Sequence, residues 1–205
     1  MCQPNRPIVI GVTGGIGAGK SVVCRVCALR GIPLYDCDSR ARRIMEISGE
    51  IRSALRHLAG KEAIMPDGSV NRPLLASVIF NDPVLRREVN TLVHKAVRTD
   101  IEAWIDQMRA PVAIIESAIL HSSGLDNMVD EIWLVSAPPE LRTARAAARS
   151  NLSEEQISCR ISAQQGEFDN LDSSRLHIIL NDGMTPLLPR IDNLLHTLIN
   201  HNNNA

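Results

Sequence analysis

The chain has 205 residues, 44% of them hydrophobic, and a formal net charge of −1 at pH 7, which suits one globular domain with insertions. A pI near 6.6 and an aromatic content of 2% exclude the basic field and the stacking rings of a nucleic-acid-binding surface. No apolar run approaches the roughly 18 residues of a membrane span. The first six residues lead directly into a predicted strand, so we expect no signal peptide and a cytoplasmic location.

The stretch from Pro7 to Ser21 combines a predicted strand, a glycine loop and the start of a predicted helix. Residues 8–12 form an apolar, β-branched run that is typical of a buried strand. Gly14 to Ser21 fits the phosphate-loop pattern G-x-x-x-x-G-K-[ST] without a gap. A helix-length segment, 22–29, follows and is stopped by Gly31. This order of strand, loop and helix predicts a site for a nucleoside triphosphate.

Each residue type in this loop has a physical reason. Glycines allow phosphate oxygens to approach backbone N–H groups, and the following helix presents the positive end of its dipole. Lys20 can reach the β- and γ-phosphates, and the Ser21 hydroxyl is the expected magnesium ligand. Three glycines also occur in ordinary tight turns, but here the loop, the Lys-Ser pair and both flanking elements agree.

A second short apolar run, 32–35, predicts a strand that delivers Asp36 and Asp38 to its carboxyl end. Functional groups of open α/β sheets gather at that edge, where the phosphate loop also lies. Either carboxylate could serve magnesium or accept a proton from an acceptor hydroxyl. The alternative for Asp38 or Ser39 is that it only caps the next helix.

The segment from Gly49 to Arg109 is mostly helical in pattern, with one turn at 66–69. Asn71 and Asp82 are predicted helix caps, each followed by a proline close behind. This block separates the second and third strands, so it is predicted to be an insertion on the sheet. In a kinase it would bind the acceptor.

The part of the chain after Arg109 predicts three more strands, 112–115, 132–135 and 176–180, and a final helix that opens at Pro186. The third strand ends at Glu116, where an acidic residue can hold magnesium through water. Arg145 and Arg149 share one face of a predicted helix and could close over the phosphates, whereas Arg142 fits a solvated face. A capping box at Ser153 and a mobile turn at 150–152 complete this segment. The five cysteines, two of them small core residues at 24 and 27, are expected to be reduced.

The ordered set of motifs resembles the dephospho-CoA kinase family over nearly the whole chain. The motifs are the loop Thr13 to Ser21, the element Tyr35 to Arg42, the segment Asp67 to Leu75 with Ile79-Phe80, His94, the R-x-x-x-R pair, Gln164 and Asn181. The resemblance implies an α/β fold, with a three-layer P-loop kinase core, a five-stranded parallel sheet, a helical CoA-binding insertion and a lid. It implies one kinase domain over 1–205, with its core at 7–48, 111–150 and 170–200, the insertion at about 49–110 and the lid at about 145–168.

The resemblance also implies a reaction, in which ATP with Mg²⁺ phosphorylates the ribose 3′-hydroxyl of dephospho-CoA. By position, Asp38, Lys20 and Arg145 correspond to catalytic residues, with Asp38 as the general base. ATP-binding positions are Gly14, Gly15, Gly17, Ala18, Gly19, Lys20, Ser21, Val22 and Asn181. Acceptor-side positions are Asp36, Arg42, Arg72 and His94, and the metal positions are Ser21 and Glu116. The expected assembly is a monomer or a small homo-oligomer.

The chain departs from the family pattern at several positions. His94 is followed by Lys95 instead of the usual proline, which permits an unbroken helix. The family's glutamate after the third strand has no counterpart in Ser117 to Leu120, and Glu116 is the nearest substitute. Val22 replaces a hydroxyl residue and leaves only its backbone N–H for phosphate.

Two other functions are also consistent with the phosphate-loop pattern. The first is another small-molecule kinase with the same core, acting on a nucleoside, a sugar or shikimate. The second is a GTP-binding switch, but the guanine-reading N-K-x-D is absent, since Asp182 follows Asn181, and no D-x-x-G follows the third strand.

Overall fold

The computed structural model describes residues 6–149, 153–164 and 166–203. The chain divides into two compact units, which are described separately below. Unit 1 comprises Met1–Asp36 and Ile105–Ala205, and unit 2 comprises Cys37–Trp104. The predicted turn at 150–152 and the first five residues lie outside the described residues. Within the described parts of the chain, no helix combines the length and the apolar character needed to cross a membrane.

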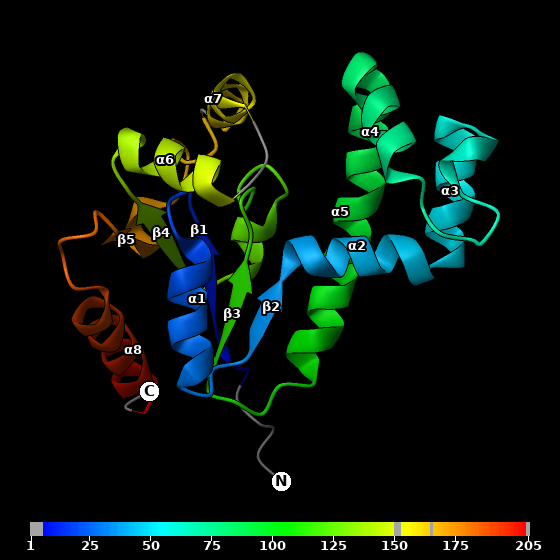
Figure 1. The fold of residues 1–205 in the computed structure, drawn as a ribbon. Helices are drawn as coiled ribbons and strands as arrows, with labels where there is room; N and C mark the ends of the chain where they lie inside the picture. Colours follow the sequence, from blue (N-terminus) through cyan, green and yellow to red (C-terminus); the bar gives the residue numbers. More distant parts are fainter. Residues whose placement is uncertain (1–5, 150–152, 165, 204–205) are drawn as a thin grey trace, which may run out of the picture. The chain divides into compact units, whose positions relative to one another are not determined.

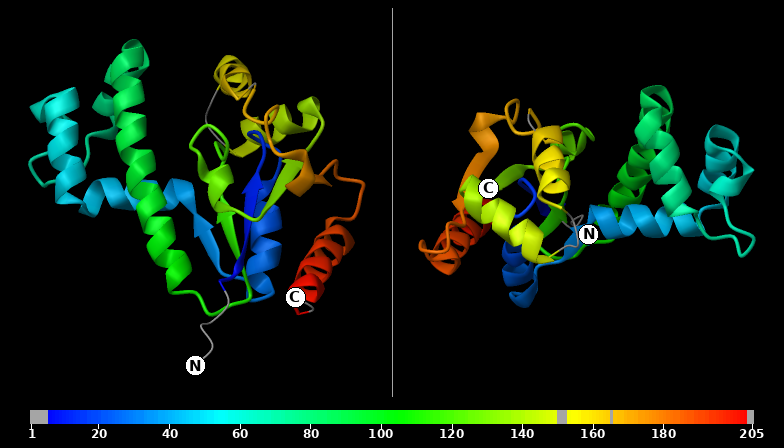
Figure 2. Two further views of the ribbon diagram at one scale, coloured as in Figure 1. Left: turned by 180° about the vertical axis from the view of Figure 1, so that it is seen from behind. Right: turned by 45° about the horizontal axis from the view of Figure 1, so that its top comes forward.

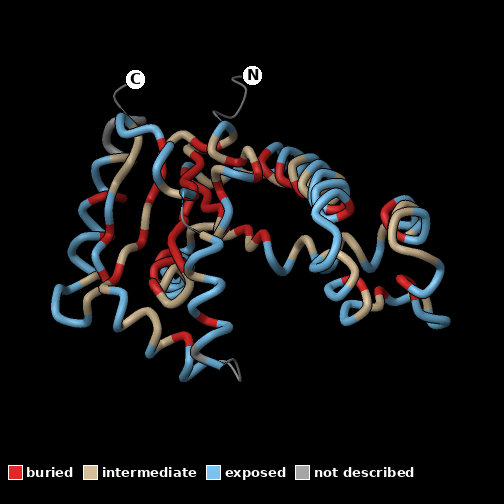
Figure 3. The backbone as a smooth tube through the Cα atoms, turned by 90° about the horizontal axis from the view of Figure 1, so that it is seen from above, coloured by how far each residue is buried: buried red, intermediate tan, exposed pale blue. Residues whose placement is uncertain are grey.

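Unit 1 is built on a parallel sheet of five strands in the order β2-β3-β1-β4-β5 (Figure 1). The strands are β1 Ile8–Thr13, β2 Leu34–Asp36, β3 Val112–Glu116, β4 Glu131–Ser136 and β5 Leu176–Leu180. All neighbouring strands pair in parallel, with β1 at the centre between β3 and β4. The central strands are continuous apolar runs in the sequence because both of their faces are buried (Figure 3). The predicted five-stranded parallel sheet is therefore confirmed.

The helices of unit 1 are α1 Lys20–Leu29, α6 Pro139–Arg149, α7 Glu154–Ala163 and α8 Leu187–Asn203, with short 3₁₀ turns at Leu125–Met128 and Ser173–Arg175. Helix α1 packs on β1 and β3, and α8 packs on β5 and α1. Their apolar sides meet the sheet in one core that includes Ile10, Val23, Cys27, Trp133 and Ile191. Figures 1 and 2 show α6 and α7 next to each other at the carboxyl ends of the strands.

Unit 2 is helical and has its own core. Its elements are α2 Cys37–Ile47, α3 Gly49–Ala59, the 3₁₀ turn Lys61–Ala63, α4 Arg72–Asn81 and α5 Pro83–Asp106, whose last two residues belong to unit 1. Ile51, Leu55, Leu75, Leu85 and Val89 are buried together between these helices. As expected, α5 continues unbroken past His94 and Lys95.

Several local predictions are confirmed and three boundaries are corrected. The Asn71 side chain accepts from the Leu74 N–H, and Ser153 forms the predicted capping box with Gln156. The second strand begins at Leu34 and includes Asp36, whereas Asp38 lies inside the first turn of α2. The chain from Asp36 to Asp38 is therefore not extended. Asp38 lies within the helix and does not precede it, as a cap residue would. Helix α2 groups with the helical unit, although residues up to 48 were expected in the core.

Candidate functional site

The glycine loop connects the central strand of unit 1 to helix α1, at the carboxyl edge of the sheet. Gly14, Gly17 and Gly19 have φ values of 148°, 74° and 98°, which side-chain-bearing residues rarely adopt. At Gly14 an added Cβ would lie 2.3 Å from the Val135 carbonyl oxygen of β4, so the loop also packs too closely for a side chain. The loop therefore exposes backbone to a ligand at the positive end of α1.

The first residues of α1 carry the polar groups of the phosphate-loop pattern. Lys20 Nζ donates to the Gly14 carbonyl oxygen at 2.7 Å, so the ammonium group spans the loop. Ser21 is exposed at the helix start. The Val22 N–H donates to the Gly19 carbonyl oxygen at 3.0 Å, so this N–H already takes part in the first turn of the helix.

A cleft of about 520 Å³ lies beside the loop and runs along α1. Three arginines contribute to it, two from α6 and one from α1, together with apolar side chains of α1. Its lining residues are Gly17, Gly19, Ser21, Val22, Arg25, Val26, Leu29, Arg145, Arg149 and Asn181. Apolar walls with a few placed charges suit a small anionic molecule with a flat ring system. The predicted shared face of Arg145 and Arg149 is confirmed.

Asn181, which follows β5, ties three parts of this site together. Its side-chain Nδ2 donates to the Ala18 carbonyl oxygen at 2.8 Å, and its own carbonyl accepts from Arg145 Nη1 at 2.9 Å. Its backbone N–H donates to Ser136 at the end of β4. The residue is 9% exposed, so these bonds are largely shielded from water.

Arg142 of α6 does not lie on a solvated face, which corrects the expectation from sequence. Its Nε donates to the Ile16 carbonyl oxygen at 3.1 Å, and its guanidinium group covers Gly15. Partial burial lowers the pKa of the Arg142 guanidinium, although an arginine stays charged at neutral pH. Gln164, just after α7, accepts the Ile16 N–H at 2.8 Å through Oε1. The α6–α7 segment thus binds both peptide groups of Ile16.

Two carboxylates lie side by side at the ends of neighbouring strands. Asp36 of β2 and Glu116 of β3 are register partners, and Glu116 is also level with Val12 of β1. The buried Cys24 thiol of α1 hydrogen-bonds to Glu116, and burial, followed by the Glu116 charge, raises the pKa of this thiol. Oxygen ligands of this kind suit Mg²⁺. Among the described residues no three acidic, histidine or cysteine side chains gather as a metal cage.

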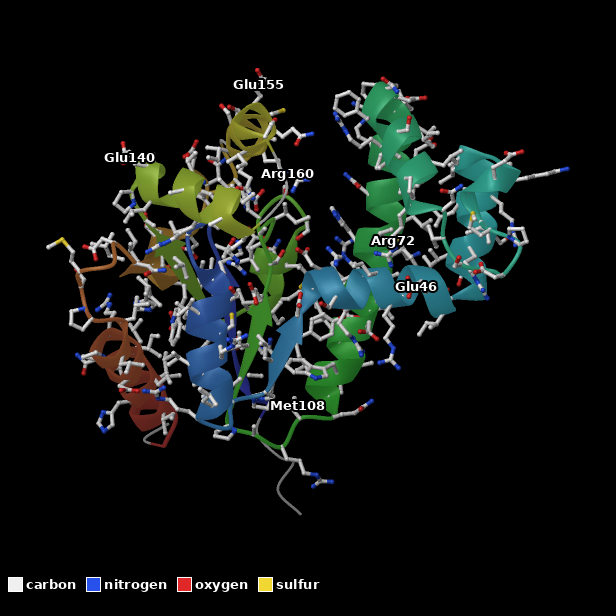
Figure 4. The ribbon with its side chains drawn as sticks, viewed as in Figure 1. Glu46, Arg72, Met108, Glu140, Glu155 and Arg160 are labelled. Atoms are coloured by element: carbon white, nitrogen blue, oxygen red, sulfur yellow. The ribbon has the colours of Figure 1, made fainter. Side chains whose placement is uncertain are left out.

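In unit 2 the acceptor-side candidates lie on α2, α4 and α5. Asp38, Arg42 and Glu46 are spaced four apart on α2 and therefore share a face. Glu46 forms an ion pair with Arg72 at the start of α4, and both are labelled in Figure 4. His94 is half-buried on α5. Asp36 belongs to unit 1, so the structure does not bring all four acceptor-side candidates into one unit.

A bidentate ion pair that the sequence did not single out also shapes unit 2. Arg40 Nε and Nη2 donate to the Asp100 carboxylate at 2.7 to 2.9 Å and join α2 to α5. Residues 40 and 100 are 60 positions apart, so no local spacing could have paired them. The contacts of Arg142 and Cys24 were missed for the same reason, because no pattern distinguishes a buried arginine or thiol partner from a solvated one.

Comparison with known proteins gives this site a context. The sequence profile of the dephospho-CoA kinase family matches residues 8–186. A dephospho-CoA kinase from Porphyromonas gingivalis is 37% identical over 191 residues, which cover 93% of this chain and 94% of the relative.

Solved structures share the fold of this chain. A crystal structure from Thermus thermophilus superposes with a TM-score of 0.79 at 29% identity and covers 96% of this chain and 98% of its own. A dephospho-CoA kinase from Campylobacter jejuni has a TM-score of 0.67 with 96% and 99% coverage; at 19% identity it supports the fold alone. By sequence profile and by its curated relatives, the chain belongs to the dephospho-CoA kinase family.

Proposed function

We propose that this kinase transfers the γ-phosphoryl group of ATP to the ribose 3′-hydroxyl of dephospho-CoA and releases coenzyme A and ADP. The observation that carries the proposal is the glycine loop at the start of α1, which opens beside a cleft containing Arg145, Arg149 and Asn181. Within a dephospho-CoA kinase family member, this arrangement fits a nucleoside triphosphate.

The loop and α1 hold the ATP phosphates in this proposal. The binding positions are Gly14, Gly15, Gly17, Ala18, Gly19, Lys20, Ser21 and Val22, with Asn181 at the cleft. Lys20 and Arg145 compensate the negative charge that spreads over the transferring group in the transition state. Arg145 is held at the cleft through its bond to the Asn181 carbonyl, so it is presented to the nucleotide without a search through many rotamers.

Magnesium is proposed to bind together with ATP. The Ser21 hydroxyl and the Glu116 carboxylate would hold it, in keeping with the preference of Mg²⁺ for a few protein oxygens combined with substrate phosphates. The Cys24 thiol donates to Glu116 and keeps this carboxylate oriented at the end of β3. When bound, the ion neutralises phosphate charge.

Asp38 is proposed as the general base and Arg42, Arg72 and His94 as acceptor-side residues. The 3′-hydroxyl loses its proton to the Asp38 carboxylate as its oxygen bonds to phosphorus, and the bond from phosphorus to the ADP oxygen breaks. Arg42 lies one helical turn after Asp38 on the same face of α2, where a cation suits an anionic acceptor. Asp36 remains the rival base.

A coupled assay for ADP with a panel of acceptors tests the function. Dephospho-CoA should be phosphorylated, whereas shikimate, a hexose and a nucleoside should give only background ADP. Mass spectrometry and a 3′-nucleotidase should then locate the new phosphate on the 3′-oxygen. Turnover of another acceptor in preference to dephospho-CoA would contradict the proposal.

The cellular setting is part of the same proposal. We expect a cytoplasmic enzyme, because both substrates are small soluble metabolites. The proposed assembly is a monomer or a small homo-oligomer. Size-exclusion chromatography with light scattering would measure the assembly.

A further inference from the structure

The phosphate loop carries two carbonyl oxygens that accept hydrogen bonds from side chains outside it. Arg142 Nε donates to Ile16 O at 3.1 Å, and Asn181 Nδ2 donates to Ala18 O at 2.8 Å. These donors come from α6 and from the residue after β5, which are more than 120 positions away in the sequence. Both carbonyls therefore point away from the ligand side of the loop, toward the protein.

The direction of a carbonyl fixes the direction of the next N–H. A peptide group is planar and trans, so the C=O of one residue and the N–H of the following residue point in opposite directions. A donor on Ile16 O therefore turns the Gly17 N–H the other way, and a donor on Ala18 O does the same for Gly19. Neither of these N–H groups has an acceptor among the described residues. They are available to an anion.

The hydrogen bonds to these two carbonyls are needed because each is followed by a glycine. Gly17 and Gly19 have φ values of 74° and 98°, but a glycine adopts several other conformations at little cost. A peptide group between such residues can rotate, which would turn the N–H away from the phosphate and the carbonyl toward it. An external donor on the carbonyl opposes this rotation, because the rotation would break the hydrogen bond.

The peptide group that joins Gly15 to Ile16 is held in the opposite orientation. The Ile16 N–H donates to Gln164 Oε1 at 2.8 Å, and the Gly15 carbonyl accepts from the Ala18 N–H at 3.1 Å. The peptide groups on the two sides of Ile16 are thus both fixed, one through Gln164 and one through Arg142. The Ile16 N–H is withdrawn from the ligand side while the Gly17 N–H is presented to it.

Gly15 shows how closely Arg142 fits the loop. Its φ is not positive, so its backbone does not require glycine. An added Cβ there would lie 2.1 Å from Arg142 Nη2 and 2.6 Å from Cζ. The guanidinium group occupies the space of the missing side chain. Alanine at this position would displace the mobile end of Arg142 without straining the backbone.

We propose that Arg142 is a positioning residue that holds the Gly17 N–H toward the phosphates by binding the carbonyl of Ile16. The inference rests on the proposed function only in taking the loop as the site of the ATP phosphates. Arg142 acts here through a peptide group of the loop, in contrast to Arg145, which is proposed to meet the transferring group itself.

The test compares Arg142→Ala, Gly15→Ala and the double variant with Arg109→Ala, a control that removes an exposed arginine at the other end of the sheet. The first readout is the Gly17 amide resonance in ¹⁵N-labelled, nucleotide-free protein. It should shift in both single variants and stay in place in the control. This readout needs neither nucleotide nor transfer, so it stands even if dephospho-CoA were not the acceptor.

The second readout is the dissociation constant for MgADP by calorimetry. Loss of one oriented N–H should weaken ADP binding by roughly tenfold in each single variant, the scale of one hydrogen bond to a charged group. The double variant should lose little more, because both changes remove the same contact. An unmoved Gly17 resonance, or additive losses in the double variant, would overturn the proposal. If Arg142→Ala does not fold, Gly15→Ala alone decides it.

Discussion

The glycine loop of unit 1 and helix α2 of unit 2 hold their polar groups in different ways. In unit 1 the bonds around the ligand site run from side chains to backbone carbonyls and N–H groups, as at Ile16 and Ala18. In unit 2 the long-range polar contacts include ion pairs between side chains, Arg40 with Asp100 and Arg72 with Glu46. The side chains of the second pair are 42% and 48% exposed.

This difference indicates a preorganised site in unit 1 and a more adaptable one in unit 2. Backbone groups that are bound by half-buried or buried side chains cannot reorient without breaking those bonds, so the loop of unit 1 would be ordered before the proposed ATP phosphates bind. Exposed ion pairs contribute little to stability, so Arg72 could leave Glu46 at low cost if it binds the acceptor as proposed. The comparison predicts large functional losses in unit 1 and small losses of stability in unit 2.

The largest effect is expected at Lys20. Lys20→Ala removes a cation that spans the loop and is proposed to compensate transition-state charge, so turnover should fall about 10²-fold or more, the scale of one lost electrostatic stabiliser. Steady-state kinetics with ATP and dephospho-CoA measure it, with circular dichroism as the check on folding. Turnover within a factor of two of the wild type would remove Lys20 from the site.

A pair of glycine variants separates backbone strain from site geometry. Gly19 and Gly31 both have left-handed φ values, 98° and 79°. An added Cβ would lie 2.1 Å from Asn181 Nδ2 at Gly19, but would meet nothing within 4 Å at Gly31. Both alanine variants should lose about 1–2 kcal/mol of stability from the left-handed backbone.

Only Gly19→Ala should also weaken MgADP binding, because it pushes Asn181 off the Ala18 carbonyl. Thermal unfolding and calorimetry on both variants test this. Equal ADP affinities in the two variants would contradict a role for the Asn181 contact.

A pH effect on stability is expected from the core of unit 1. Burial raises the pKa of the Cys27 thiol from 9.0 to about 11, so the folded state keeps this proton longer than the unfolded state. The stabilisation is complete below the unfolded pKa and is lost as pH rises from about 9 toward 11. Urea unfolding of wild type and Cys27→Ala at pH 8 and pH 10.5 isolates the contribution. A pH-independent difference between the two would contradict it.

The smallest effect is expected in unit 2. Glu46→Ala breaks the exposed pair with Arg72, which should change the free energy of unfolding by roughly 0–1 kcal/mol. Urea titration at low and at high salt measures it. A loss of several kcal/mol would mean that this pair is a rigid part of unit 2, and the contrast between the units would fail.

Strand and helix patterns predicted most of the fold, because each rests on local chemistry. The five apolar runs became the five strands, and Asn71 and Ser153 cap helices through bonds to residues three positions away. The glycine loop could be predicted equally well from the sequence, since its residue types and spacing are local.

The contacts that complete the site could not be predicted from local sequence patterns. Arg142 and Arg145 differ by one helical turn, yet one binds Ile16 and the other binds Asn181, and only the packing of α6 decides this. The helical start of α2 at Cys37 was also hidden, because the preceding strand pattern extends smoothly into it.

In the proposed mechanism, unit 1 binds the nucleotide while Asp38 of unit 2 supplies the base. The most direct measurement is the transfer rate of Asp38→Asn at saturating substrates, taken with its ATP and dephospho-CoA affinities. If Asp38 is the base, most transfer should be lost while both affinities stay near those of the wild type. A loss mainly in Mg-ATP affinity, or a fully active Asp38→Asn beside an inactive Asp36→Asn, would contradict it.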